Sequence, residues 1–287
     1  MASGDKDGSI LRRVDALISR FEPIVEPIKS FTWEGPDGEQ YWEFLRRSIV
    51  VRQMQALRAA LIMAKADQGA FGVTFLRPAY EELVWVEYLT AHKAIASELV
   101  RLLGAHEIAA NLDTQNQFIG AKGMLNVGFT QSFVKRRLAA TRESDVRLRA
   151  LGRKLGWRDG QMSPSLAFLA RKIGREKEYN FIYHATSRFV HFSTVETFRR
   201  VWGNSGQVTI STENFSRYGT DFSLYWGLRV FVETVSAAQI SDFADRRTND
   251  GVGEEILQLV EGLHPVEIVT AAELESWPSR REYGKKQ

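Results

Sequence analysis

The sequence predicts an all-α (mostly α) protein, a multi-helix bundle with at most a small β-hairpin or strand near residues 207–212. Apolar residues recur at helical spacing through most of the chain, and the seven prolines lie mainly where segments would start or stop. Only the stretch at 207–212 reads as a strand. Apolar residues make up 44% of the chain and charged residues 25%, as in ordinary globular proteins, so we expect a folded core.

The expected elements follow one another with few interruptions. A first helix at residues 9–22 ends at a pair of prolines, and a glycine-containing loop follows it. The next helix, at 41–66, is amphipathic, because apolar residues alternate with arginines. A helix at 78–103 is apolar nearly all round in its first half, which predicts a central, buried element. Shorter helices are expected at residues 105–119, 128–155, 165–174, 178–200, 221–246 and 252–262.

Three regions are expected along the chain. They are an N-terminal helix and linker at residues 1–35, a helical bundle domain at 36–265, and a C-terminal tail at 266–287 that we expect to fray. The N-terminus has no basic segment followed by an apolar run, and no stretch approaches the roughly 18 apolar residues that cross a bilayer. We therefore expect a cytoplasmic protein with no membrane partner.

Several kinds of chemistry are excluded by residue type or by missing motifs. The chain has no cysteine, which excludes disulfides, thiolate metal sites and cysteine nucleophiles. It contains no Walker motif, no HExxH and no GxSxG, and the nearby pair His184 and His191 lacks a spaced carboxylate, so we expect neither a metal nor a cofactor. The glycines at 120, 123 and 128 resemble a phosphate loop weakly and are better interpreted as a break between helices.

Basic residues are concentrated between Lys135 and Lys177, and Arg136 and Arg137 lie near the start of this stretch. Such asymmetry indicates a polyanionic partner, RNA in particular. The alternative is a solvated helix face that binds nothing.

One helix is predicted to carry a stripe of polar groups. At about 100° per residue, the side chains of Tyr183, His184, Ser187, Arg188 and His191 fall on one side of the helix. This stripe contains no Lys or Glu, which are usual on exposed faces, and its residue types are common at functional sites. An ordinary surface face is the alternative. The opposite, apolar side is expected to hold Phe181, Ile182, Ala185, Phe189, Val190 and Phe192.

Arg77 and Glu81 are four residues apart at the start of the helix that is expected to be buried. If that helix is buried, the two charges need partners. An internal ion pair is one interpretation, and a polar binding or catalytic pocket is the other.

The segment Arg77-Pro-Ala-Tyr80-Glu81, followed much later by Ser187 and His191, resembles a bacterial family of unknown function, DUF5677, over roughly residues 40–245. That family looks related to the HEPN group of helical bundles, many of which are toxins or phage-defence RNases. In those proteins an Arg followed four to six residues later by a His forms a composite site at a dimer interface. This chain departs from the pattern, since only two residues separate Arg188 from His191.

The resemblance implies a metal-independent endoribonuclease acting in defence or stress. A histidine would move the proton of a ribose 2′-hydroxyl, and an arginine would neutralise the developing phosphorane charge. Expected partners are RNA, a second copy in a homodimer, or other defence proteins. The alternatives are a non-catalytic binding or scaffold protein, in which the polar cluster locks two helices together, and a small-molecule or nucleotide sensor. The expected catalytic residues are His191, Arg188, Arg77 and Glu81, and the expected substrate-binding residues are Tyr183, Ser187, His184, Arg136 and Arg137.

Overall fold

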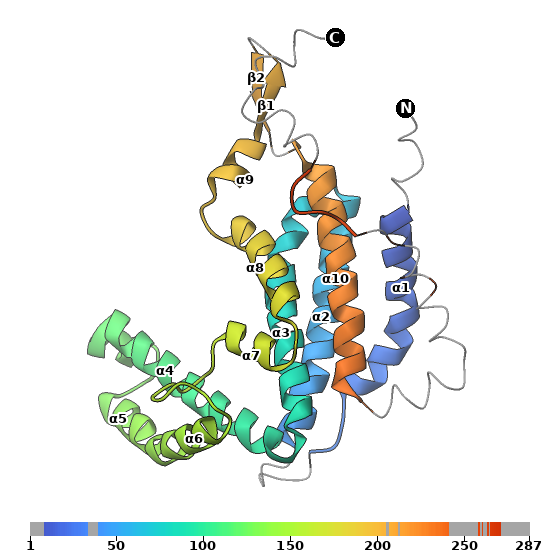
Figure 1. The fold of residues 1–287 in the computed structure, drawn as a ribbon. Helices are drawn as coiled ribbons and strands as arrows, with labels where there is room; N and C mark the ends of the chain where they lie inside the picture. Colours follow the sequence, from blue (N-terminus) through green and yellow to red (C-terminus); the bar gives the residue numbers. More distant parts are fainter. Residues whose placement is uncertain are drawn as a thin grey trace. The chain divides into compact units, whose positions relative to one another are not determined.

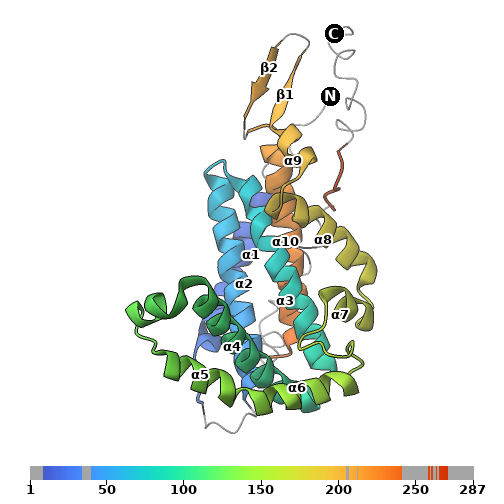
Figure 2. The same cartoon turned by 90° about the vertical axis from the view of Figure 1, so that its left-hand side faces the viewer.

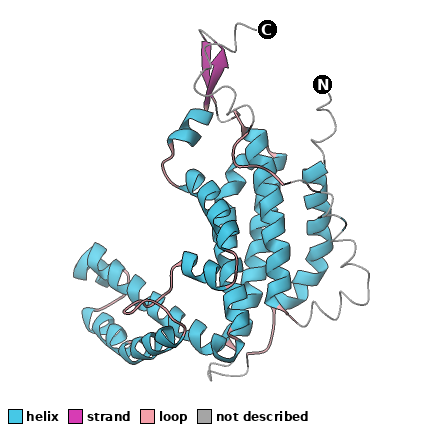
Figure 3. Cartoon of the chain, viewed as in Figure 1, coloured by secondary structure: helices cyan, strands magenta, loops and turns pink. Residues whose placement is uncertain are grey.

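The structure is a computed structural model that describes residues 9–33, 40–204, 207–211, 213–240, 258, 260, 263 and 265–270. Helices make up most of it, which confirms the predicted mostly α class (Figure 3). Strands β1 (Val201–Asn204) and β2 (Gln207–Ile210) pair antiparallel as a small hairpin, with Val201 opposite Ile210. Strand β2 covers residues 207–210 of the stretch 207–212 that the sequence predicts as a strand.

The helices follow the predicted order, with several different boundaries. The predicted helix at 78–103 is wrong at both ends, because a helix begins at Val73 and ends at Ala91. The predicted helix at 178–200 is interrupted at His191, whose backbone is extended (φ −119°, ψ 164°). The region predicted as a helix at 252–262 lies almost entirely outside the described residues. The helices are α1 (Ser9–Val25), α2 (Tyr41–Lys65), α3 (Val73–Ala91), α4 (Lys93–Asn126), α5 (Gln131–Ala140), α6 (Arg142–Lys154), α7 (Leu166–Lys172), α8 (Glu176–Val190), α9 (Thr194–Arg199) and α10 (Ser216–Ala238), with 3-10 turns η1 (Glu26–Lys29) and η2 (Gly69–Gly72).

The chain divides into two compact units. One unit consists of residues 1–31, 47–87 and 174–287, and the other of residues 32–46 and 88–173. The polar cluster predicted from the sequence falls in the first unit, whereas Arg136 and Arg137 fall in the second.

The core of the first unit forms around two apolar helices, α3 and α10. Figures 1 and 2 show α10 beside α1, α2 and α3, and the ring of Phe21 meets that of Phe231 edge to face at 4.8 Å. Removing these side chains from water is the main driving force for folding. The burial predicted for the first half of the helix at residues 78–103 is confirmed, because this part forms α3. Fully buried side chains of this unit on the two helices include Leu83, Val84, Val86, Phe222, Leu224, Leu228 and Phe231.

The turn η2 lies against α10 because both have small residues where they meet. A Cβ placed on Gly219 would lie only 2.7 Å from the Cβ of Ala70, a separation that real Cβ atoms essentially never show. One turn further along α10, the Ser223 hydroxyl donates to the carbonyl of Gly69 at 3.1 Å. This close approach places Ala70 and Phe71 next to the start of α10.

In the second unit, α4 packs against α5 and α6. Gly120 interrupts α4 with a positive φ of 68°, so the interpretation of this glycine as a helix break is confirmed. Trp157 packs onto Gly152, and its indole N–H donates to the Tyr88 hydroxyl at 3.2 Å.

Candidate functional site

Arg77 and His191 lie side by side although 114 positions of sequence separate them. Arg77 Nη1 is 2.9 Å from His191 Nε2. A guanidinium can only donate, so Nε2 is the acceptor, and the imidazole is neutral with its proton on Nδ1. The structure therefore presents an arginine and a neutral histidine as one hydrogen-bonded pair.

Two further side chains fix the orientation of Arg77. Its Nε donates to Glu81 Oε1 at 3.1 Å, one helical turn along α3, and its Cζ lies 4.4 Å from the centroid of the Tyr183 ring on α8. Burial opposes the charge of Arg77, but Glu81 and Tyr183 outweigh it and raise the pKa of the guanidinium. Arg77 is thus a fixed cation, with Nη1 directed at His191.

This cluster of Arg77, Glu81, Tyr183 and His191 lies at the surface of its unit. The side chains of Arg77 and Glu81 are 21% and 42% exposed, and Tyr183 is 37% exposed. Arg77 and Glu81 thus form their ion pair at the surface and not in the interior, because α3 is buried on its other faces and turns this one towards solvent. A solute has access to the cluster.

The rest of the predicted stripe does not join this cluster. Arg188 Nη2 instead donates to the backbone carbonyl of Ile268 at 3.2 Å. Ser187 Oγ is buried and has no hydrogen-bond partner among the described residues, so it does not contact a substrate in this conformation. His184 is exposed and forms no side-chain hydrogen bond within the part of the chain that the structure describes.

The prediction that Phe192 lies on the apolar side of the same helix is wrong, because Phe192 lies beyond the end of α8. Phe192 is 88% exposed and Val190 is 40% exposed. Helical spacing no longer applies to Phe192, since α8 ends at Val190 and the chain turns into extended backbone at His191.

The basic stretch at 135–177 is largely exposed, and Arg136 and Arg137 of α5 are among its exposed residues. Arg175 is an exception, because carboxylates surround it. Its guanidinium reaches Glu87 at 2.5 Å, Glu233 at 2.6 Å and Glu178 at 2.8 Å. These ion pairs assign Arg175 a structural role between α3, α8 and α10.

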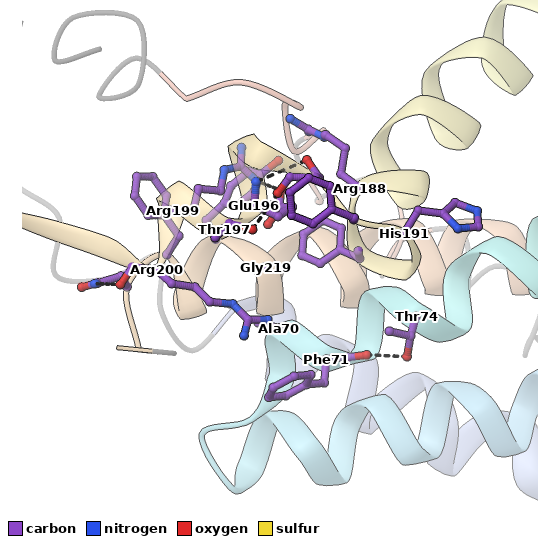
Figure 4. Close-up of a pocket in the computed structure, with 16 residues that line it drawn as sticks. Ala70, Phe71, Thr74, Arg188, His191, Glu196, Thr197, Arg199, Arg200 and Gly219 are labelled. Atoms are coloured by element: carbon purple, nitrogen blue, oxygen red, sulfur yellow. Dashed lines mark hydrogen bonds and ion pairs between the residues drawn. The ribbon is translucent and has the colours of Figure 1, made fainter. Parts of the chain in front are cut away.

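A pocket of about 300 Å³ adjoins the cluster at His191 (Figure 4). It lies where α8, α9, α10 and η2 meet, and Figure 4 shows His191 directed away from the side that carries Arg199 and Arg200. Its charged lining residues among those described are three arginines and one glutamate. They are Arg188, Arg199, Arg200 and Glu196.

Arg199 is the most deeply buried of these arginines, at 4% exposure. Its Nη1 pairs with Glu196 at 2.7 Å, its Nη2 donates to the Ile268 carbonyl at 3.0 Å, and its Cζ lies 4.7 Å from the centroid of the Tyr218 ring. Arg199 and Tyr218 were not predicted as site residues from the sequence, because the packing that buries Arg199 joins segments far apart in the chain.

A family model described as a family of unknown function, DUF5677, matches residues 44–208. The chain belongs to DUF5677. The match confirms the family that the sequence resembles, and it includes the whole Arg77–His191 cluster and also Arg188 and Arg199. Tyr218 and Ile268 of this DUF5677 chain lie beyond the matched residues. Comparison with curated proteins and with solved structures gives no match.

No described helix has the length and apolar character that crossing a membrane requires. Over the same described residues, no three His, Cys, Asp or Glu side chains gather in a group that suits a metal ion.

Proposed function

We propose that this DUF5677 protein is a cytoplasmic, HEPN-like endoribonuclease acting in defence or stress, with His191 and Arg77 as its catalytic residues. The observation that supports this proposal is the 2.9 Å contact between Arg77 Nη1 and His191 Nε2 at an accessible surface. A neutral imidazole beside a fixed guanidinium is the pair needed to activate a hydroxyl and to stabilise a phosphorane.

The reaction needs no group beyond these side chains and water. His191 Nε2 takes the proton of a ribose 2′-hydroxyl, and the 2′-oxygen attacks the adjacent phosphorus. The bond from phosphorus to the 5′-oxygen breaks, leaving a 2′,3′-cyclic phosphate, and the 5′-oxygen takes a proton from water. Arg77 donates to the phosphorane oxygens. When the substrate binds, the hydrogen bond between Arg77 and His191 is therefore replaced by two others, one from Arg77 to the phosphate and one from the 2′-hydroxyl to His191 Nε2.

In this proposal exposed cations of each unit contact the RNA backbone. Arg200 at the pocket is exposed in the first unit, and Arg136 and Arg137 on α5 are exposed in the second. Contacts of this kind with the RNA backbone release counterions, so RNA binding is expected to weaken steeply as salt is raised.

Cleavage of total RNA in EDTA tests the proposal. The wild-type protein is compared with His191→Ala and with His106→Ala, a matched control that removes an imidazole from α4 outside the predicted site. We expect cleavage by the wild type and the control and its loss in His191→Ala, with circular dichroism confirming that all three are folded. Equal cleavage by a folded His191→Ala would refute the assignment of His191.

A scaffold role is the second candidate, because Arg77 joins α3 to α8 through the ring of Tyr183. In that case neither the wild type nor His191→Ala cleaves RNA, and His191→Ala has a lower melting temperature than the wild type.

A further inference from the structure

Three side chains converge on one backbone oxygen beside the pocket. The carbonyl of Ile268 accepts from Tyr218 Oη at 2.9 Å, Arg199 Nη2 at 3.0 Å and Arg188 Nη2 at 3.2 Å. The donors come from α10, α9 and α8 respectively. Three elements therefore bring their donors to a single point.

This donor set fits an oxyanion better than it fits a carbonyl. A carbonyl oxygen has two lone pairs and no net charge, whereas a phosphate offers three oxygens and up to two negative charges. Paired guanidinium groups match phosphate geometry and are the usual partners of that group. Arg199 is 4% exposed and is fixed by Glu196, so its position is set before any ligand arrives.

The segment at 265–270 that now holds this position is bound through its backbone. The Val266 carbonyl accepts from the Trp226 indole at 3.2 Å, and the Glu267 carbonyl accepts from Tyr218 Oη at 2.8 Å. The side chain of Glu267 itself is exposed. Figure 1 shows this segment in red along the first turns of α10. Backbone hydrogen bonds of this kind can be replaced by those of a charged ligand.

We propose that Arg188, Arg199 and Tyr218 form a binding site for the phosphate of a nucleoside monophosphate, which displaces the segment at 265–270. The carbonyl of Ile268 fills the phosphate position in the absence of the nucleotide. The adjoining pocket of about 300 Å³ has aromatic lining residues, Phe71 and Phe189 among them, that suit a base. His191 also lines this pocket, but the three phosphate donors are distinct from the Arg77–His191 pair, and the inference does not rest on RNA cleavage.

Calorimetric titration of the full chain with AMP, and with adenosine as the probe that lacks phosphate, tests the site. We expect AMP to bind at least about tenfold more tightly than adenosine, since hydrogen bonds to charged groups are strong. Arg188→Gln should weaken AMP binding about tenfold or more. Arg217→Gln removes the same charge from an exposed position of α10 outside the pocket lining and should change it less than about twofold.

Limited proteolysis after Glu267 by a glutamate-specific protease tests the displacement. AMP should accelerate this cleavage in the wild type and have no such effect in Arg188→Gln. If Arg188→Gln does not fold, Tyr218→Phe removes one donor, retains the ring and should still weaken AMP binding several-fold.

Failure to bind AMP, or equal AMP affinity in the wild type and the donor variants, overturns the site. Binding that leaves cleavage after Glu267 unchanged or slower overturns the displacement. Arg77→Gln lies outside the pocket lining and should bind AMP as the wild type does, so failure of this inference and failure of the proposed nuclease are distinguishable.

Discussion

Arg77 Nη1 and His191 Nε2 lie 2.9 Å apart because α8 ends at Val190. The extended backbone at His191 takes its side chain out of the helical stripe and directs it to α3. Arg188, still helical, is directed to Ile268 instead. The arginine that accompanies the histidine in this fold is thus the one on α3, distant in sequence.

Arg77→Lys tests whether the shape of the guanidinium matters as well as its charge. A lysine ammonium lacks the planar set of donors with which Arg77 reaches both Glu81 and His191, so we expect RNA cleavage to fall about 10²-fold to 10³-fold. Initial cleavage rates in EDTA measure this loss. Arg52→Lys, a matched change at an exposed arginine of α2, should leave the rate unchanged. Full activity of Arg77→Lys would reduce the role of Arg77 to that of a point charge.

The close approach of η2 to α10 predicts opposite effects for two glycines of one helix. Gly219→Ala places a methyl group 2.7 Å from the Cβ of Ala70 and should lower the free energy of unfolding by about 1 to 3 kcal/mol. Gly227→Ala, which meets Leu57 Cδ1 at an ordinary 3.5 Å, should raise it by about 0.5 to 1 kcal/mol through helix propensity. Urea unfolding measures both. Equal effects would contradict the packing described at Gly219.

Much of the fold could be predicted from the sequence because it depends on local pattern. The nearly continuous apolar residues of α3 indicated a buried helix, and the alternation near residue 207 indicated the hairpin. Arg77, Glu81, Tyr183 and His191 were all selected by residue type and spacing, and the structure brings these four together.

The break between α8 and α9 could also have been predicted. Ser193 accepts from the backbone N–H of Glu196, and a serine followed three residues later by a glutamate is a recognised helix start. The convergence of Arg188, Arg199 and Tyr218 on Ile268 could not, because it depends on packing among four segments of the chain.

Glu82 predicts a specific dependence of stability on pH. Its side chain is 13% exposed, and burial raises the pKa of its carboxyl despite the neighbouring Arg52 and Gln53. Because the pKa is higher in the folded state than its ordinary value of 4.5, protonation stabilises the fold. This contribution is complete below the unfolded pKa and is lost as the pH rises through the folded pKa.

The test compares wild type and Glu82→Gln by urea unfolding at several values between about pH 4 and about pH 7. The wild type should lose more stability than Glu82→Gln over this range, whereas Glu213→Gln, at an exposed position, should follow the wild type. Parallel curves for wild type and Glu82→Gln would show that burial does not raise the pKa of Glu82.

Ser187 predicts a gain of stability on truncation. Its Oγ is buried without a hydrogen-bond partner among the described residues, and such a group destabilises the folded state. Ser187→Ala should therefore raise the free energy of unfolding by about 1 kcal/mol. Ser193→Ala, which removes the cap of α9, should lower it by about 1 kcal/mol in the same urea titration.

Comparing the two variants distinguishes the destabilising effect of a buried hydroxyl without a partner from any general effect of removing a hydroxyl. A loss of stability in Ser187→Ala would mean that its Oγ has a partner, such as a bound water, in solution. A gain of stability with unchanged RNA cleavage would remove Ser187 from the set of substrate-binding residues. A gain of stability together with a loss of cleavage would instead indicate that the buried hydroxyl is retained for function, at the expense of stability.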